Sequence, residues 1–274
     1  MKICRLRLPE GIVHAAQDED QWVLCRGSLE AGFVATEEVL DLETDARWLP
    51  PVIPPTIYAI GLNYKAHAIE MAKPIPEHPV VTMKSPTALL EPGGIIRLPR
   101  FLASDSVDFE CELGIIIGRR CKNVSPEDAL NYVFGYTAAN DVSARDWQKI
   151  YSGGQWCKGK TFDTFCPIGP VMVTADEISD PDNLEIATFL NGESMQSSNT
   201  SDMIFSVAEL VAFLSGSTTL EPGTLILSGT PTGVGVARNP PRFLQDGDSV
   251  IIEIQGIGRL ENSVREEQLS GDPC

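Results

Sequence analysis

Short apolar runs separated by turn residues follow one another along most of the chain, a pattern typical of a mainly β fold. Asn191-Gly192, which follows one of these runs, is a strong signal for a β-hairpin turn. Helical periodicity is less common, and SVAELVAFL at residues 206–214 is its clearest instance. We therefore expect a mainly β protein with some α-helix. The expected strands include residues 57–60, 80–84, 95–98, 134–140, 185–190, 225–227, 249–255 and 257–264.

The first 52 residues have a different character from the rest of the chain. Alternation of apolar and polar residues at 2–6 and 21–26 predicts a small β-rich lobe. The proline-rich stretch LPPVIPP at residues 49–55 is typical of a stiff, extended connector. We therefore divide the chain into a small N-terminal domain (1–52), a larger domain (53–266) that holds the candidate catalytic residues discussed below, and a tail (267–274).

An acidic stretch within one of the apolar runs is the first candidate for chemistry. FECEL at residues 109–113 alternates as a strand does, which would place Asp108, Glu110 and Glu112 on one face. The β-branched run that follows predicts a strand buried on both sides. Asp141 ends another predicted strand. Acids at the mouth of a buried strand need compensation, and Mg²⁺ with its preference for oxygen ligands would supply it. The spacing alone, however, favours a solvated strand face.

A histidine and a glutamate form the second candidate. Asn63 is suited to cap a helix that would carry His67 and Glu70 three residues apart, on one face. A carboxylate beside an imidazole orients the ring and raises its basicity, as a general base requires. An exposed helical pair without catalytic function is the alternative that the spacing alone favours.

Several further polar residues could contact a substrate, although the sequence leaves their roles open. Lys84 would either face the acids or lie in solvent at a sheet edge. Lys158 and Lys160 would share a face if residues 156–167 form a strand, and a lysine there is a point charge for a carboxylate or keto oxygen. Among Arg145, Asp146 and Gln148, one or two would point at a substrate, or all would lie on a helix surface.

A loop rich in glycine and hydroxyl groups, SGTPTGVG at residues 228–235, follows the strand at 225–227. It lacks the Gly-Lys-Ser/Thr ending of a phosphate-binding loop, and no helix start follows as a dinucleotide fingerprint requires. Its N–H groups and hydroxyls are suited to hold a carboxylate instead.

The amino-acid composition limits the kinds of molecule that we expect this protein to bind. The chain has 21 basic and 38 acidic residues and a net charge of −17, which argues against nucleic-acid binding. No apolar run reaches the roughly 18 residues of a membrane span, and no signal-peptide core follows Met1. Seven scattered cysteines without a C-x-x-C pair fit reduced thiols in a cytoplasmic protein. With three histidines in the chain, a metal site would be built mainly from oxygen ligands.

Six motifs, in this order, resemble the fumarylacetoacetate hydrolase family from about Ile57 to Val264: GLNYKAHAIEM, DFECELGIIIG, GYTAANDVSARDWQ, KTFDTFCPIGP, LILSGTPTGVG and GDSVIIEI. The resemblance implies a mixed β-sandwich or roll, usually assembled as a homodimer, that binds Mg²⁺ or, alternatively, Mn²⁺ or Ca²⁺. It implies that the metal ligands are Glu110, Glu112 and Asp141. It further implies that His67 and Glu70 activate water, that Lys160 is the family lysine, and that Gln148 and Thr230 contact the substrate.

The short N-terminal lobe resembles the smaller members of the family. Ile60 and Pro76 stand where fumarylacetoacetase itself has an acid and an arginine. The resemblance therefore implies a 2-oxo or 2,4-dioxo acid substrate other than fumarylacetoacetate. Our main hypothesis is a hydrolase of a C–C bond in an acylpyruvate, acting through a metal-stabilised enolate. The alternative is an oxaloacetate decarboxylase or a 2-hydroxydienedioate isomerase on the same site, and a third hypothesis is a binding protein without turnover.

Overall fold

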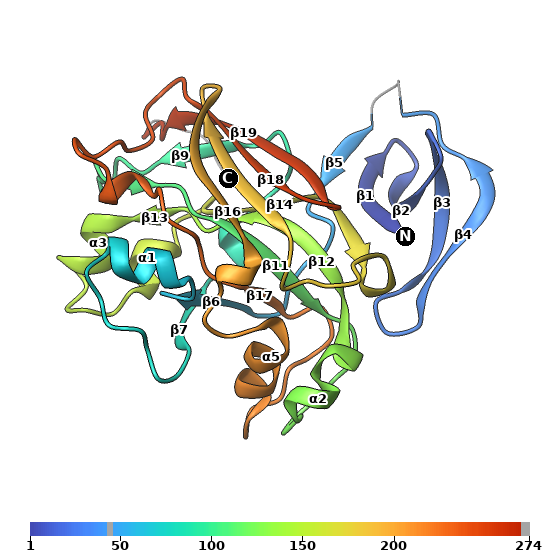
Figure 1. Ribbon diagram of the computed structural model, residues 1–274. Helices are drawn as coiled ribbons and strands as arrows, with labels where there is room; N and C mark the ends of the chain where they lie inside the picture. The colour runs from blue at the N-terminus through green and yellow to red at the C-terminus, as the bar shows by residue number, and fades with distance from the viewer. Residues whose placement is uncertain (43–45, 270–274) are drawn as a thin grey trace.

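The computed structural model describes residues 1–42 and 46–269 (Figure 1). The predicted tail at residues 267–274 lies outside the described residues from residue 270 onward. The cysteines in the described part of the chain are free thiols. Across the same residues, no helix has the length and apolar character needed to cross a membrane.

A large mixed sheet forms the centre of the molecule, with twelve strands among the described residues. Its main path runs through β4 (Gly32–Val39), β3 (Gln21–Ser28), β2 (Gly11–Asp18), β1 (Lys2–Leu8), β14 (Cys166–Thr174), β12 (Val133–Asn140), β11 (Cys111–Ile117), β17 (Leu225–Leu227), β6 (Ile57–Gly61) and β7 (Val80–Lys84). Two short strands join it from the side, β5 (Arg47–Leu49) on β1 and β8 (Leu89–Leu90) on β14.

A second sheet of five strands packs against the first, with the order β16 (Glu193–Asn199), β15 (Glu185–Leu190), β18 (Ser249–Ile254), β19 (Gly258–Glu266) and β9 (Ile95–Leu98). A small pair, β10 (Val107–Asp108) and β13 (Ser143–Ala144), lies beside them. Leu113 and Ile115 of β11 share one apolar cluster with Ile186 and Ile252 of the second sheet, whereas Ile116 belongs to another cluster. The strand is therefore buried on both faces, as its β-branched run predicts.

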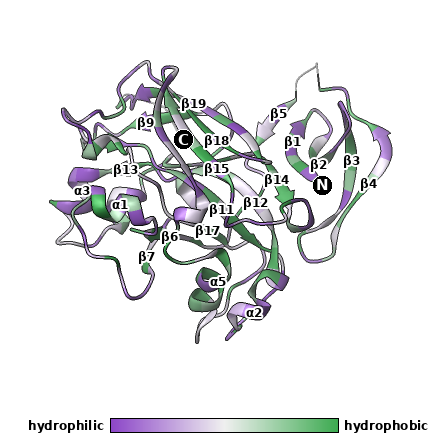
Figure 2. Ribbon diagram, viewed as in Figure 1, coloured by the Kyte–Doolittle hydropathy of each residue, from purple (hydrophilic) through white to green (hydrophobic). Residues whose placement is uncertain are grey.

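The helices are short and lie at the periphery of the sheets: α1 (Lys65–Glu70), α2 (Pro126–Ala129), α3 (Arg145–Lys149), α4 (Cys157–Lys160) and α5 (Val207–Ser215). Single 3₁₀ turns are η1 (Pro86–Ala88), η2 (Leu130–Tyr132), η3 (Ala175–Glu177), η4 (Thr200–Asp202) and η5 (Gly235–Ala237). α5 begins with a capping box between Ser206 and Glu209 and buries its apolar face. Figure 2 shows the apolar residues concentrated along the central strands.

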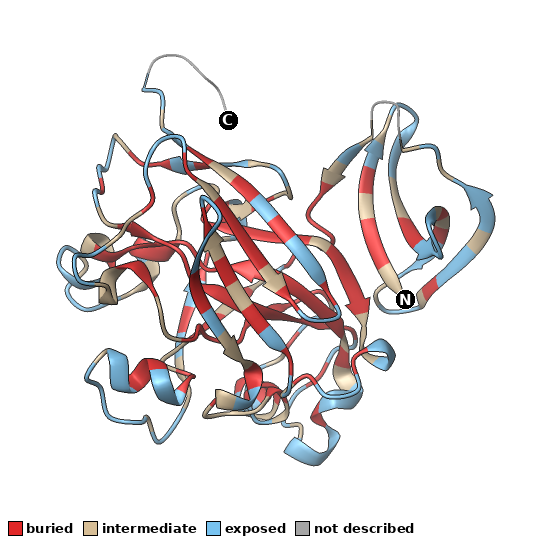
Figure 3. Cartoon of the chain, turned by 45° about the horizontal axis from the view of Figure 1, so that its top comes forward, coloured by how far each residue is buried: buried red, intermediate tan, exposed pale blue. Residues whose placement is uncertain are grey.

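The N-terminal strands β1 to β5 form a lobe beside the main body (Figures 1 and 3). The lobe is continuous with the large sheet, because β1 pairs with β14 through Lys2 opposite Val173 and Ile3 opposite Met172. The mainly β class and the N-terminal lobe are thus confirmed, and each of the eight strands named from the apolar runs occurs with ends shifted by at most two residues.

One helix cap differs from the sequence prediction. Tyr64, rather than Asn63, occupies the capping position of α1 and makes no side-chain cap bond. Asn63 is fully buried, where its amide donates to the carbonyls of Ser228 (2.7 Å) and Phe205 (3.1 Å) and accepts from the Phe205 N–H (2.9 Å). The hydrogen bonds of the Asn63 side chain thus connect the start of α1 to the loop that follows β17.

Candidate active site

Three buried carboxylates meet where β11 begins and β12 ends. Glu110 and Glu112 lie at the start of β11, and Asp141 directly follows β12, whose Asn140 pairs with Cys111. The Asp141 N–H donates to the Glu110 carbonyl at 2.9 Å. One oxygen from each carboxylate lies within 4.8 Å of the others. Since the three residues are at most 5% exposed, the solvated strand face that the spacing favours is wrong here.

Asp108 does not join this group, because the backbone between β10 and β11 is not part of a strand. The N–H of Phe109 donates to the Asp108 carboxylate (2.9 Å), and that of Glu110 donates to the Asn140 side chain (3.0 Å). The single strand expected over residues 109–113 is therefore interrupted, and β11 starts only at Cys111. The other contacts of Asp108 are Arg145 and the N–H groups of Gly235 (2.7 Å) and Val236 (3.0 Å).

Two buried lysines surround the carboxylate group. Lys160 donates to Glu110 (2.9 Å), to Ser143 Oγ (2.9 Å) and to Asp141. Lys84, which the sequence left undecided between the acids and solvent, donates to Asp141 at 2.6 Å and to the Val142 carbonyl at 3.1 Å. Both lysines are at most 3% exposed. All three N–H bonds of Lys160 are thus directed at protein oxygens, so this residue contributes mainly its charge.

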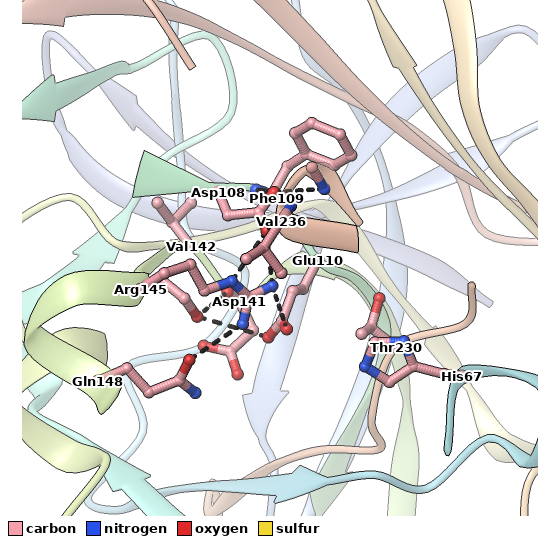
Figure 4. Close-up of polar contacts among 12 residues, drawn as sticks. His67, Asp108, Phe109, Glu110, Asp141, Val142, Arg145, Gln148, Thr230 and Val236 are labelled. Atoms are coloured by element: carbon pink, nitrogen blue, oxygen red, sulfur yellow. Dashed lines mark hydrogen bonds and ion pairs between the residues drawn. The ribbon is translucent and has the colours of Figure 1, made fainter. Parts of the chain in front are cut away.

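Arg145, at the start of α3, joins the acids to the substrate-side residues (Figure 4). Its guanidinium lies 2.8 Å from both Asp108 and Glu110, and its Nη1 donates to the Gln148 amide oxygen at 3.1 Å. The sequence places Arg145 among three candidates without choosing it. Its position four residues after Asp141, the candidate ligand at the end of a predicted strand, is the signal that could have singled it out.

Replacement of Asp108 tests how strongly this arrangement stabilises the fold. We expect Asp108→Asn to lower the free energy of unfolding by about 2–4 kcal/mol, because it weakens a buried ion pair and leaves one buried N–H without its acceptor. Urea denaturation measures the change. Asp105→Asn is the matched control, since that side chain is 98% exposed, and it should cost under about 0.5 kcal/mol. Equal stability of the two variants would contradict the role of Asp108.

The surroundings of Glu110 and Glu112 shift the pKa values of the two carboxyl groups in opposite directions. Burial by itself would raise the pKa of Glu110, but Arg145 and Lys160 outweigh burial and hold that pKa well below its usual range. Burial, followed by the charges of Asp141 and Glu110, raises the pKa of Glu112 well above its ordinary value. In the absence of a further cation, burial and the charges of the other two carboxylates therefore favour the protonated form of Glu112.

The donor set fits a divalent cation. Three carboxylates that meet within one coordination sphere, one of them with a raised pKa, offer the hard oxygen ligands that Mg²⁺ prefers. A cation there would replace the proton on Glu112 and relieve the repulsion between the acids. Glu110, Glu112 and Asp141 are thus the residues that would hold the metal.

This exchange of a proton for a metal ion has a pH signature. The folded chain binds the Glu112 proton more tightly than the unfolded chain, so metal-free stability should fall as pH rises from about 4.3, the ordinary glutamate pKa, through the raised one. Affinity for Mg²⁺ should rise over the same pH range. Calorimetric titration in two buffers of different ionisation enthalpy measures the proton released. Binding of Mg²⁺ with no proton release anywhere above pH 4.3 would contradict the assignment of Glu112.

His67 and Glu70 form a pair on α1 in which the histidine is buried and the glutamate is exposed. Nδ1 of His67 lies 2.9 Å from Glu70 Oε2, while Glu70 Oε1 accepts the N–H of Gly233 at 2.9 Å. A carboxylate at Nδ1 selects the tautomer with the proton on Nδ1, which leaves the lone pair on Nε2. His67 is 6% exposed, so the exposed-pair alternative is wrong for the histidine.

Thr230 and Gln148 lie on opposite sides of the same site (Figure 4). Thr230 Oγ1 accepts from the Gln196 amide at 2.8 Å, which leaves its own proton available to a ligand. Gln148 uses its oxygen for Arg145, so its NH₂ group can donate into the site. Both residues line one cavity with Glu110, Glu112, Arg145, Lys160 and His67. The cavity has an empty volume of about 540 Å³ and opens to solvent.

The condition under which Lys158 and Lys160 would share a face, a strand over residues 156–167, is not met. Residues 157–160 form the short helix α4, and in a helix positions two apart point in different directions. Lys160 is directed at the acids, whereas the Lys158 ammonium lies 4.3 Å from the centre of the Phe162 ring. Gly159 permits this turn, because a Cβ there would lie 2.6 Å from the backbone nitrogen of Gln148.

Comparisons with known proteins identify the family of this chain. The family model described as fumarylacetoacetate (FAA) hydrolase C-terminal matches residues 56–265. The mitochondrial oxaloacetate tautomerase fahd2 of Xenopus laevis is 45% identical over 230 residues, which cover 84% of this chain and 72% of that protein.

Two solved structures extend the likeness over nearly the whole chain. The 5-carboxymethyl-2-hydroxymuconate delta-isomerase of Mycobacterium smegmatis superposes with a TM-score of 0.85 at 37% identity, covering 97% of this chain and 100% of its own. The 2-hydroxyhepta-2,4-diene-1,7-dioate isomerase of Mycobacterium marinum gives 0.84 at 38% identity, with coverage of 97% and 99%. This chain is thus an enzyme that belongs to the fumarylacetoacetate hydrolase family.

Proposed function

We propose that this protein is a divalent-metal-dependent isomerase that interconverts the keto and enol forms of a dicarboxylic 2-oxo acid, with oxaloacetate as the first substrate to test. The observation that carries the proposal is that one cavity brings a carboxylate-oriented imidazole next to a buried group of three acids. The names of the relatives support isomerisation over hydrolysis, since tautomerases and isomerases move a proton and break no C–C bond.

The side chains divide the reaction between them. A divalent cation held by Glu110, Glu112 and Asp141 would supply Lewis-acid polarisation of the 2-oxo group. Nε2 of His67 removes the proton from C3, and the electrons of that C–H bond form the C2–C3 double bond as the oxo oxygen gains negative charge. The imidazolium then returns a proton to that oxygen, which completes the enol. Glu70 stabilises the imidazolium between the two transfers.

The remaining residues of the site hold the substrate. The Gln148 NH₂ group and the Thr230 hydroxyl donate to its oxygens from opposite sides, while Lys160 contributes positive charge next to the acids. None of these roles needs a water molecule aimed at a second carbonyl. The same groups would also suit hydrolysis of an acylpyruvate if water entered beside His67, so the reaction has to be tested directly.

One assay separates the reactions. Purified protein with Mg²⁺ is mixed with oxaloacetate prepared as its enol, and the ultraviolet absorbance of the enol is followed against Mg²⁺ alone. Pyruvate is measured in parallel to detect decarboxylation, and acylpyruvates are supplied to detect C–C hydrolysis. We expect faster loss of the enol without pyruvate release. Cleavage of acylpyruvates with no effect on the oxaloacetate enol would overturn the proposal in favour of hydrolysis.

A further inference from the structure

Two lysines at the mouth of the active-site cavity form no ion pair with a carboxylate in the part of the chain that the structure describes. Lys73 follows α1, where its backbone N–H donates to the Ala68 carbonyl, and Lys149 ends α3. Both line the cavity, and both are exposed. Within residues 1–42 and 46–269, neither ammonium lies within 4.0 Å of an acidic group. They differ in this from Lys160 and Arg145, which are bound to the acids deeper in the cavity.

Their surroundings favour an anion at this point. Partial burial, followed by the positive charge of Arg145, lowers the pKa of Lys149; Glu110 and Asp108 act in the opposite direction, and Lys73 adds a further lowering. Two cations that line one opening, with no ion-pair partner among the described residues, repel each other, and an anion bound between them relieves that repulsion. In a protein with a net charge of −17, such a paired positive charge at a cavity mouth also helps an anionic ligand to enter.

The charges at the acidic end leave no cation for a second carboxylate. Four buried carboxylates, Asp108, Glu110, Glu112 and Asp141, face Lys84, Arg145 and Lys160. With Glu112 ionised, as metal binding requires, these side chains carry one negative charge in excess, and the two charges of a divalent cation turn it into one positive charge. The carboxylate next to the 2-oxo group neutralises that charge. A second carboxylate on the same substrate must therefore find its partner elsewhere in the cavity.

An apolar wall connects the two ends of the cavity. Trp156 lines it together with Ile60, Leu62 and Met71. The indole lies directly on the backbone of Gly61, where a Cβ would come within 2.3 Å of a ring carbon. The cavity thus has an acidic, metal-binding end, an apolar side and a basic mouth. This sequence of surfaces fits a short carbon chain with a carboxylate at each end.

We propose that Lys73 and Lys149 form a subsite for the distal carboxylate of the substrate, which makes the enzyme selective for dicarboxylic over monocarboxylic 2-oxo acids. The inference rests on the proposed function for its substrate class. It does not depend on which reaction follows binding, so it can be tested by binding alone.

The test uses pairs of acids of equal length that differ only in the terminal carboxylate. Calorimetry in the presence of Mg²⁺ compares 2-oxoglutarate with 2-oxopentanoate, and 2-oxoadipate with 2-oxohexanoate. The variants are Lys73→Met, Lys149→Met and the double variant, which keep an unbranched apolar side chain of similar length and remove the charge. Lys122→Met is the matched control, because Lys122 is exposed and does not line the cavity. Oxalate, too short to reach the mouth, reports on the metal end.

We expect the wild-type protein to bind at least one dicarboxylic acid more tightly than its monocarboxylic match. Each single variant should weaken that binding about 3- to 5-fold and the double variant about 10-fold or more, with a smaller difference at high salt. Affinity for the monocarboxylic acids and for oxalate should stay within 2-fold, as should all affinities of Lys122→Met.

Three results would overturn the subsite: equal affinity of the wild-type protein for both members of each pair, no binding of any of the four acids, or equal weakening of both members in the lysine variants. Failure of the proposed function looks different. In that case oxaloacetate enol is not converted, while the preference for dicarboxylic acids and its loss in the variants persist.

Discussion

The His67→Ala variant is expected to lose about 10²- to 10⁴-fold in kcat for conversion of the oxaloacetate enol, with a much smaller change in KM. The imidazole is the group in the cavity whose lone pair can take a proton from carbon, whereas the groups suited to hold the substrate lie on other elements. Steady-state kinetics with saturating Mg²⁺ measure both constants.

Two further variants make this result specific. His78→Ala is the matched control, because His78 is exposed and packs against Phe213, and its kcat should equal that of the wild-type protein. Glu70→Gln should give an intermediate loss, since the amide still binds the ring but stabilises the imidazolium less. A His67→Ala variant that keeps full kcat would exclude the imidazole as the base.

The second large effect concerns the metal. We expect Glu110→Ala to reduce Mg²⁺ affinity by more than about 10²-fold, so that calorimetry no longer detects binding. The substitution removes a ligand, and it also removes the acid that neutralises Arg145 and Lys160, whose charges would then repel an incoming cation.

The comparison variants separate these two contributions. Glu110→Gln keeps the shape of the side chain and loses the charge, so its affinity should also fall steeply. Glu127→Ala, at an exposed position, should bind Mg²⁺ as the wild-type protein does. Unchanged affinity in Glu110→Ala, with an unchanged circular dichroism spectrum, would refute the ligand assignment.

Much of the fold follows from local patterns, because strand periodicity and turn residues act over a few positions. The β-branched run in β11 and the Asn191-Gly192 turn after β15 are examples, and both occur as the sequence predicts. The grouping of Glu110 with Asp141 was predicted as well, although the residues alone did not favour it. It required the resemblance to a family, since antiparallel pairing of β11 with β12 is a contact across about 30 residues.

The remaining features could not be read from the sequence because they depend on distant partners. Lys84 is a lysine at the end of an edge strand by local pattern, and only the fold shows that Asp141 lies 2.6 Å away. Asn63 has the residue type of a helix cap, but its amide binds carbonyls from the loop that follows β17 and from the segment before α5 instead. Lys160 is directed at the acids by a helical turn that depends on close contact of Gly159 with α3.

The two oxygens of Glu70 connect the proposed base to the loop that carries Thr230. One oxygen orients the imidazole of His67, and the other accepts the N–H of Gly233 in that loop. A substitution that shifts the loop therefore also removes a restraint on Glu70, and through Glu70 on the imidazole. The position of a substrate-binding hydroxyl and the direction of the His67 lone pair are thus set by one carboxylate.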